Sequence, residues 1–98
     1  MTVWFATRHA GAREWALRQG IEVDHQVDHL DIEHVNPGDT VIGSLPVHLA
    51  AAICEREARY LHLILNVPSS ARGRELTADE MAAFGARLQT FRVERLES

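Results

Sequence analysis

The sequence DTVIGSLPVHL, residues 39–49, predicts a buried strand, a tight turn and the start of a helix. Residues 40–42 are β-branched and form a short apolar run directly after the turn signal NPGD. Gly43 lets the backbone approach a neighbouring strand or a ligand closely. Ser44 is expected to cap the helix, with Pro46 tolerated in its first turn. The stretch therefore predicts a strand–turn–helix unit at the centre of an α/β fold.

The helix that follows this strand, VHLAAAIC at residues 47–54, has almost no polar face. We therefore expect it to be covered on most sides. A strand that ends in Gly-Ser and leads into a helix directs free N–H groups and the positive end of the helix dipole to one point. α/β proteins bind anions there, usually phosphate. The alternative is a plain strand–helix connection with a capping serine, and these residues leave both interpretations open.

Length and composition indicate an ordinary globular protein. The chain has 98 residues, of which 46% are hydrophobic and 24% charged, so we expect a single domain over residues 1–98 with a modest core. No apolar run approaches the roughly 20 residues that span a bilayer, and the N-terminal residues do not resemble a signal peptide. Cys54 is the single cysteine and is expected to be a small core residue. These features predict a cytoplasmic protein without membrane contact.

The charge pattern limits the choice of partner. The net charge is −4, and all ten basic residues are arginine. An acidic domain of this size is poorly suited to a long nucleic acid, which requires many phosphate contacts. A few arginines in one pocket could still bind a small anion, because the guanidinium group recognises phosphate in a bidentate manner. A GC-rich genome would explain the absence of lysine equally well.

Hydrophobic patterns along the chain predict alternating strands and helices. Strands are expected at 2–7, 21–30 (exposed, at a sheet edge), 39–43, 59–67 and 91–96, and helices at about 12–19, 46–58 and from the capping box at 77–80 onward. In the third helix, Met81, Phe84, Gly85 and Leu88 share one face. The alternation favours a mostly parallel, small Rossmann-like sheet with helices on both faces.

Polar residues follow three of the expected strands. Ligands of such folds gather at the carboxyl ends of the strands. The candidates there are Thr7, Arg8 and His9; Gly43, Ser44 and His48; and Asn66, Ser69, Ser70, Arg72 and Arg74. The arginines could hold an anion, and the loop at 69–75 could close over it. The alternatives are a surface arginine at position 8 and a solvated polar loop.

The six histidines differ in position. His9 and His48 each follow a strand end at a predicted helix start, where the dipole favours the neutral imidazole that suits acid–base chemistry. His62 alternates within an apolar strand, which predicts a core histidine. A metal site in the segment 25–34 is disfavoured, because on a strand His25 and His29 would lie roughly 13 Å apart. The sequence also lacks a dinucleotide fingerprint and a P-loop, so we expect neither a metal nor a cofactor.

Three segments together resemble a known family. TVWFATRHAGAREW, NPGDTVIGSLPVHLAA and RYLHLILNVPSSARGRELTADEM resemble the small CRISPR-associated accessory proteins numbered sixteen in the Csx series, over nearly the full length of the chain. The resemblance implies a ring nuclease of type III CRISPR defence, which degrades a cyclic oligoadenylate messenger. It also implies a Rossmann-like homodimer whose symmetric cleft holds cyclic tetra-adenylate.

The implied reaction is attack of a ribose 2′-hydroxyl on the adjacent phosphate, giving linear di-adenylate with a cyclic phosphate end. It needs no metal if the hydroxyl is held in line and the phosphorane is stabilised. Position alone assigns Arg8, His9 and His48 to catalysis, and Thr7, Gly43, Ser44, Ser69, Ser70, Arg72 and Arg74 to ligand binding. The alternatives are a module that sequesters the ring without cutting it and a regulatory protein that docks onto another CRISPR protein.

Overall fold

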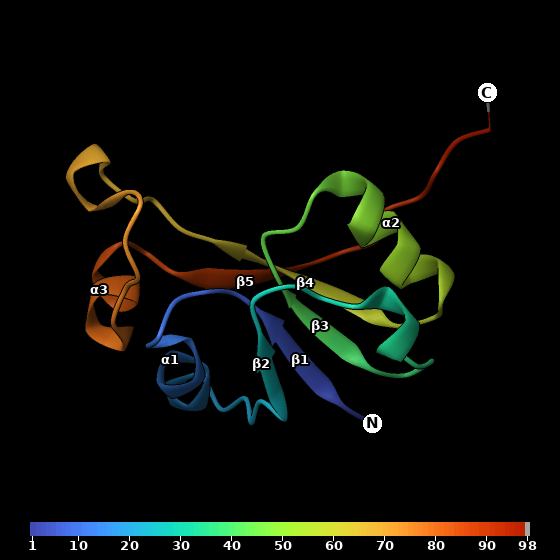
Figure 1. The fold of residues 1–98 in the computed structure, drawn as a ribbon, viewed down its shortest axis with the longest axis horizontal. Helices are drawn as coiled ribbons and strands as arrows, with labels where there is room; N and C mark the ends of the chain where they lie inside the picture. The colour runs from blue at the N-terminus through green and yellow to red at the C-terminus, as the bar shows by residue number, and fades with distance from the viewer. Residues whose placement is uncertain (98) are drawn as a thin grey trace.

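A five-stranded sheet in the order β2-β1-β3-β4-β5 forms the centre of the protein (Figure 1). In this computed structural model, which describes residues 1–97, the strands are β1 (Val3–Ala6), β2 (His25–Val27), β3 (Thr40–Gly43), β4 (Arg59–Ile64) and β5 (Arg87–Phe91). The first four strands are parallel, and β5 runs antiparallel to β4. Ser98, the last residue of the expected domain, lies outside the described residues. The predicted α/β fold with a mostly parallel sheet is confirmed.

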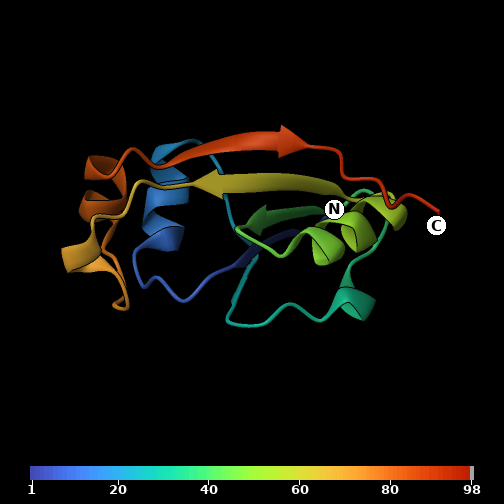
Figure 2. The ribbon, with the colours of Figure 1, turned by 90° about the horizontal axis from the view of Figure 1, so that it is seen from above.

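Helices cover both faces of the sheet, as Figure 2 shows from above. On one face, α1 (Ala12–Arg18) and α3 (Ala78–Ala83) pack over Phe5 and Ile42. On the other face, α2 (Val47–Glu55) and the 3-10 turn η1 (Ile32–His34) pack over Val41 and Tyr60. These side chains alternate along β1, β3 and β4, which is why the sheet has two apolar faces. None of the helices in residues 1–97 is long and apolar enough to pass through a membrane.

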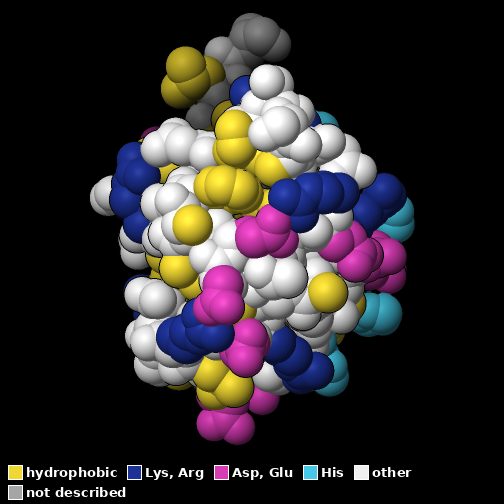
Figure 3. All heavy atoms as spheres, turned by 90° about the vertical axis from the view of Figure 1, so that its left-hand side faces the viewer, with side chains coloured by type: hydrophobic (Ala, Val, Ile, Leu, Met, Phe, Trp, Pro, Cys, Tyr) yellow, Lys and Arg dark blue, Asp and Glu magenta, His cyan; other side chains and the backbone are white. Residues whose placement is uncertain are grey.

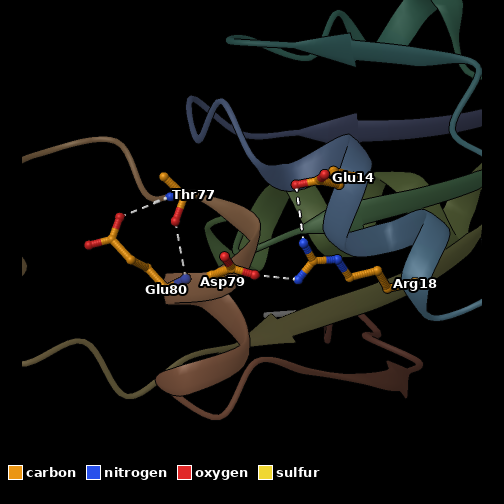
Figure 4. A network of polar contacts seen from close by, with 5 residues as sticks. All are labelled: Glu14, Arg18, Thr77, Asp79 and Glu80. Carbon is orange, nitrogen blue, oxygen red and sulfur yellow. Dashed lines mark hydrogen bonds and ion pairs between the residues drawn. The ribbon is translucent and has the colours of Figure 1, made fainter.

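The N-termini of α1 and α3 are in close contact. A Cβ atom on Gly11 would lie 2.1 Å from the Ala78 backbone nitrogen, so only glycine fits at this position. The capping box predicted at the start of α3 is present, with Thr77 and Glu80 exchanging hydrogen bonds. Figure 4 shows this box beside Arg18, which reaches from α1 to Asp79 on α3 at 2.8 Å. Because Arg18 and Asp79 are exposed, this ion pair contributes little stability.

The last two predicted elements have different bounds in the structure. α3 ends at Ala83, and Gly85 adopts a positive φ of 73° that turns the chain. Leu88, which shares helical spacing with Met81 and Phe84, therefore lies on β5 rather than on the helix. The strand predicted at 91–96 is wrong, because β5 is formed by Arg87–Phe91 against β4. The edge strand predicted at 21–30 does lie at the sheet edge, but β2 has only three residues.

The start of α2 also differs from the prediction. Ser44 does not cap the helix, whose N-cap position is occupied by Pro46 without a side-chain hydrogen bond. The Ser44 hydroxyl instead donates to the Leu63 carbonyl oxygen at 2.6 Å and ties the end of β3 to β4. The helix is also less covered than expected, since Val47 is 72% exposed. The apolar surface at its N-terminus is thus open to solvent.

Candidate functional site

The fold places a topological switch point between β1 and β3, because the chain leaves β1 toward β2 on one side and continues from β3 to β4 on the other. Ligands of open α/β sheets bind near such a point, beyond the carboxyl ends of the strands. Here the ends of β1 and β3 approach closely, and a Cβ atom on Gly43 would lie 3.0 Å from the Ala6 carbonyl oxygen. Gly43 is buried and therefore permits a close backbone contact between the two strands.

Two cavities occupy the space between the end of β1 and the loop after β4, and we call them the strand-end cavities. The first, of about 350 Å³, is lined by His9, Leu65, Val67, Ala71, Arg72, Gly73 and Arg74. The second, of about 430 Å³, is lined by Arg8, His9, Gly73, Arg74 and Glu75. They share His9, Gly73 and Arg74. The structure thus brings residues that are more than sixty positions apart in sequence to one place.

His9 is held from both sides in the strand-end cavities. Its backbone N–H donates to the Thr7 hydroxyl at 3.2 Å, and its carbonyl oxygen accepts from the Gln26 side chain at 2.8 Å. The Leu76 backbone N–H donates to His9 Nδ1 at 3.1 Å, so the neutral ring carries its proton on Nε2. No atom of residues 1–97 bonds to Nε2, which is not buried. His9 therefore offers an N–H donor to a ligand.

This geometry changes the role expected for His9. The imidazole belongs to the turn before α1, two residues ahead of the N-cap residue Gly11. The hydrogen bond from the Leu76 backbone N–H fixes which ring nitrogen of the neutral imidazole carries the proton. A base at this position would need a lone pair facing the ligand, and that lone pair is used inside the protein. His9 is thus suited to stabilising negative charge on a phosphate oxygen.

The three arginines of the strand-end cavities are not equivalent. Arg72 donates through Nε to the Val67 carbonyl oxygen at 3.2 Å, and its two terminal nitrogens have no partner in the described part of the chain, so they can bind an anion. Arg74 pairs with Glu80 at 2.6 Å, and Arg74 together with the Thr77 backbone N–H lowers the pKa of Glu80 to about 2. An incoming anion must compete with that carboxylate for Arg74. Arg8 is exposed and lies 3.5 Å from His29 Nε2.

Several of the predicted site residues lie elsewhere. Ser44 and His48 are exposed near the start of α2 and line neither strand-end cavity. Ser69 and Ser70, in the 3-10 turn η2 (Ser69–Ala71), are exposed and likewise do not line them. Thr7 acts indirectly by holding the His9 backbone. Of the positions predicted from sequence, the structure gathers Arg8, His9, Arg72 and Arg74.

Figure 3 views the end of the molecule that carries η2, α3 and α1. Basic side chains on this face stand among acidic ones and do not form a continuous strip. Such a surface is better matched to a few phosphates than to the regular backbone of a long nucleic acid. Among residues 1–97, no three His, Cys, Asp or Glu side chains gather closely enough to hold a metal ion.

Sequence reasoning missed a third cavity, which surrounds His62. His62 is half-buried rather than part of the core, and its Nδ1 atom lies 2.6 Å from the Tyr60 hydroxyl. The two rings line a space of about 220 Å³ together with Leu45, Val47, Ala50, Phe91 and Val93. We call it the His62 cavity. Its signal in the sequence is the spacing of Tyr60 and His62, which places both on one face of β4.

These features define a small α/β protein with a mostly parallel sheet and an arginine- and histidine-lined hollow at its carboxyl edge. Residues 4–94 match the model of the family described as "Putative CRISPR-associated protein (Cas_VVA1548)". The chain therefore belongs to this family of CRISPR-associated proteins. No curated protein and no solved structure matches it.

Proposed function

We propose that this CRISPR-associated protein is a metal-independent ring nuclease that degrades cyclic tetra-adenylate. The observation that carries the proposal is that the His9 Nε2–H donor and the terminal nitrogens of Arg72, which have no partner among residues 1–97, belong to the lining of one cavity. Such fixed donors bind a phosphate and stabilise the additional charge of its transition state. The choice of ligand rests on the resemblance to ring nucleases, and membership of a CRISPR-associated family is consistent with it. We propose that the cavity holds one phosphate of this ligand.

The reaction follows from donors placed around a phosphate. A 2′-hydroxyl attacks the adjacent phosphorus, the bond to the 5′-oxygen breaks, and a 2′,3′-cyclic phosphate remains. The proton lost by the 2′-oxygen is balanced by the one gained at the 5′-oxygen, so two cuts divide the ring without consuming water. We assign charge stabilisation to His9 and Arg72, additional positive charge to Arg8, and acceptance of the 2′-hydroxyl proton to Glu75, which lines the second strand-end cavity.

Cyclic tetra-adenylate carries several phosphates, so it requires several phosphate-binding places at once. Cyclic tetra-adenylate has rotational symmetry, and a two-fold dimer can present the same groups to it twice. We therefore propose that the active form is a homodimer with two sets of strand-end cavities around one ring. One copy would then need to hold only part of the ligand.

The test is incubation of purified protein with cyclic tetra-adenylate in EDTA, with the products resolved by chromatography. We expect linear di-adenylate with a cyclic phosphate end. The Arg72→Gln variant should bind and cleave roughly ten- to a hundred-fold less well, because it loses a charge-assisted phosphate contact of about 1.5–3 kcal/mol. Arg92→Gln is the matched control, because Arg92 is exposed and lines neither strand-end cavity. An intact ring after prolonged incubation with excess protein would refute the nuclease.

A second candidate function is sequestration of the ring without cleavage. The Nε2–H tautomer of His9 favours sequestration, because this imidazole donates a hydrogen bond to phosphate and does not act as a base. Arginine and N–H donors bind phosphate whether or not a reaction follows. The same incubation separates the two functions, since a sequestering module would form a stable complex from which unchanged ring is recovered.

A further inference from the structure

The His62 cavity lies on the sheet face that α2 covers, away from the loop that forms the strand-end cavities. Val47 and Ala50 of α2, Tyr60 and His62 of β4, and Phe91 of β5 contribute to its lining. Val47 is 72% exposed and Phe91 45% exposed, so two large apolar side chains are left to solvent around it. Its volume of about 220 Å³ is below the roughly 300–1,000 Å³ of sites for drug-sized ligands, which limits the occupant to one flat ring system.

The polar groups of this cavity have a defined hydrogen-bond pattern. The Tyr60 hydroxyl oxygen accepts from the Leu45 backbone N–H at 3.0 Å. It lies 3.1 Å from the Gly43 carbonyl oxygen and 2.6 Å from His62 Nδ1. Because a carbonyl oxygen can only accept, we assign the single hydroxyl proton of Tyr60 to the bond with Gly43. Burial raises the pKa of Tyr60, so its hydroxyl group stays protonated.

The tautomer of His62 follows from this pattern. With the Tyr60 proton directed to Gly43, the short contact to His62 is a hydrogen bond only if His62 donates it from Nδ1. The neutral ring then has a bare lone pair on Nε2. That atom has no partner in the described part of the chain and is not buried, so it can accept from a ligand. His62 is thus the reverse of His9, which presents a donor.

We propose that the His62 cavity binds a planar heteroaromatic ring that carries an amino or N–H donor, the chemistry of a purine base. Apolar side chains of α2 and β5 bury the flat ring, Phe91 offers an aromatic surface for stacking, and His62 Nε2 accepts the donor at its edge. A single polar group that fixes orientation in an apolar hollow is the usual design of a small-molecule site. This inference goes beyond the proposed function and does not depend on it.

The test compares two nucleosides that differ only in the donor. Adenosine and purine riboside share a purine and a ribose, but purine riboside lacks the amino group, and neither carries a phosphate. Each is titrated into ¹⁵N-labelled protein and followed by NMR at the His62 imidazole nitrogens and the backbone amides of Val47 and Phe91. We expect saturable shifts at these residues, with adenosine binding three- to tenfold more tightly, the value of one net hydrogen bond.

Variants separate the hydrogen bond from stacking. His62→Leu should reduce the affinity for adenosine to that for purine riboside and leave purine riboside binding intact, which also shows that the cavity is still folded. Phe91→Ser should weaken the binding of both nucleosides. Leu17→Ser, which removes an exposed apolar residue of α1, should leave the binding of both unchanged.

Three results would overturn the inference. Equal affinities for the two nucleosides would show that no acceptor recognises the amino group. Imidazole nitrogen shifts that place the His62 proton on Nε2 would refute the assigned tautomer. Shifts at Val47 and Phe91 that follow protein concentration and ignore adenosine would show that a second copy of the chain occupies the cavity. None of these results bears on ring cleavage, which requires the phosphates.

Discussion

Replacing Asp39 by asparagine tests how the turn before β3 is held to β1. Asp39 is only 3% exposed, yet its carboxylate has three donors. One oxygen accepts from the Thr2 backbone N–H at 2.9 Å. The other accepts from the Asn36 backbone N–H at 3.0 Å and the Trp4 indole N–H at 3.2 Å. This carboxylate therefore joins the N-terminal segment, β1 and the turn at a single buried point.

The cost of Asp39→Asn can be estimated from these contacts. An asparagine keeps one acceptor oxygen and places an NH₂ group where the other was, so at least one donor faces another donor. A hydrogen bond to a charged group contributes about 1.5–3 kcal/mol, and the remaining bonds weaken when the charge is removed. We expect a loss of about 2–4 kcal/mol in the free energy of unfolding, a large part of the 5–15 kcal/mol typical of a domain.

The effect of Asp39 should depend on pH. Burial alone would raise the pKa of Asp39, but the hydrogen bonds from Asn36, Thr2 and Trp4 outweigh it and hold the pKa below the ordinary value of 3.8. A carboxyl group with a lowered folded-state pKa stabilises the protein above its unfolded-state pKa. That stabilisation is lost as the pH falls through the folded-state pKa. The difference between parent and variant should therefore shrink when the pH falls below about 4.

The assay is urea unfolding at pH 7 and pH 3, followed by far-ultraviolet circular dichroism, because tryptophan fluorescence would include Trp4, which contacts Asp39. Asp28→Asn is the control, because Asp28 is exposed and its side chain forms no hydrogen bond or ion pair with the other described residues. It should change stability by less than about 0.5 kcal/mol. If Asp39→Asn were within that same range of the parent at pH 7, or if its effect were equal at both pH values, the reasoning would be refuted.

Three further predictions concern packing, charge and assembly. Gly11→Ala should lower the free energy of unfolding by about 1–3 kcal/mol or more, because its Cβ would overlap the Ala78 backbone; thermal melting unchanged within a degree would contradict this. Glu80→Gln should raise the affinity for labelled cyclic tetra-adenylate several-fold in anisotropy titrations, because it releases Arg74 and keeps an acceptor for the cap; equal or weaker binding would exclude Arg74 from the site. Light scattering should give a dimer mass with the ring present, and a monomer at micromolar concentration would contradict the shared site.

Local patterns were sufficient to predict most of the elements. The β-branched run at 40–42 became β3, and the capping box at 77–80 opened α3, because each depends on neighbours in sequence. The spacing of Met81, Phe84 and Leu88 was misleading for a physical reason. All three side chains pack into one core, but the chain turns at Gly85, so Leu88 reaches that core from a strand. Hydrophobic periodicity shows that these residues face the same core, but it does not show whether each of them lies on a helix or on a strand.

The sequence predicted only those site residues whose position follows from the order and direction of the strands. Arg8, His9 and Arg72 come together because the carboxyl ends of parallel strands meet at one edge of the sheet. Whether a residue such as His48 faces that space depends on the angle at which α2 leaves the sheet, which no local pattern encodes. The tautomer of His9 and the openness of the His62 cavity depend on contacts between distant segments, and these had to be read from the structure.

The most direct measurement of the central claim is single-turnover cleavage of cyclic tetra-adenylate by the His9→Ala and His48→Ala variants. Arg92→Ala serves as the control, because Arg92 is exposed and lines neither strand-end cavity. The account predicts that His9→Ala cleaves about a hundred-fold more slowly, because it loses a donor to the transition state, while His48→Ala and Arg92→Ala cleave at the parental rate. Parental cleavage by His9→Ala together with loss of activity in His48→Ala would contradict the account and place the reaction at α2.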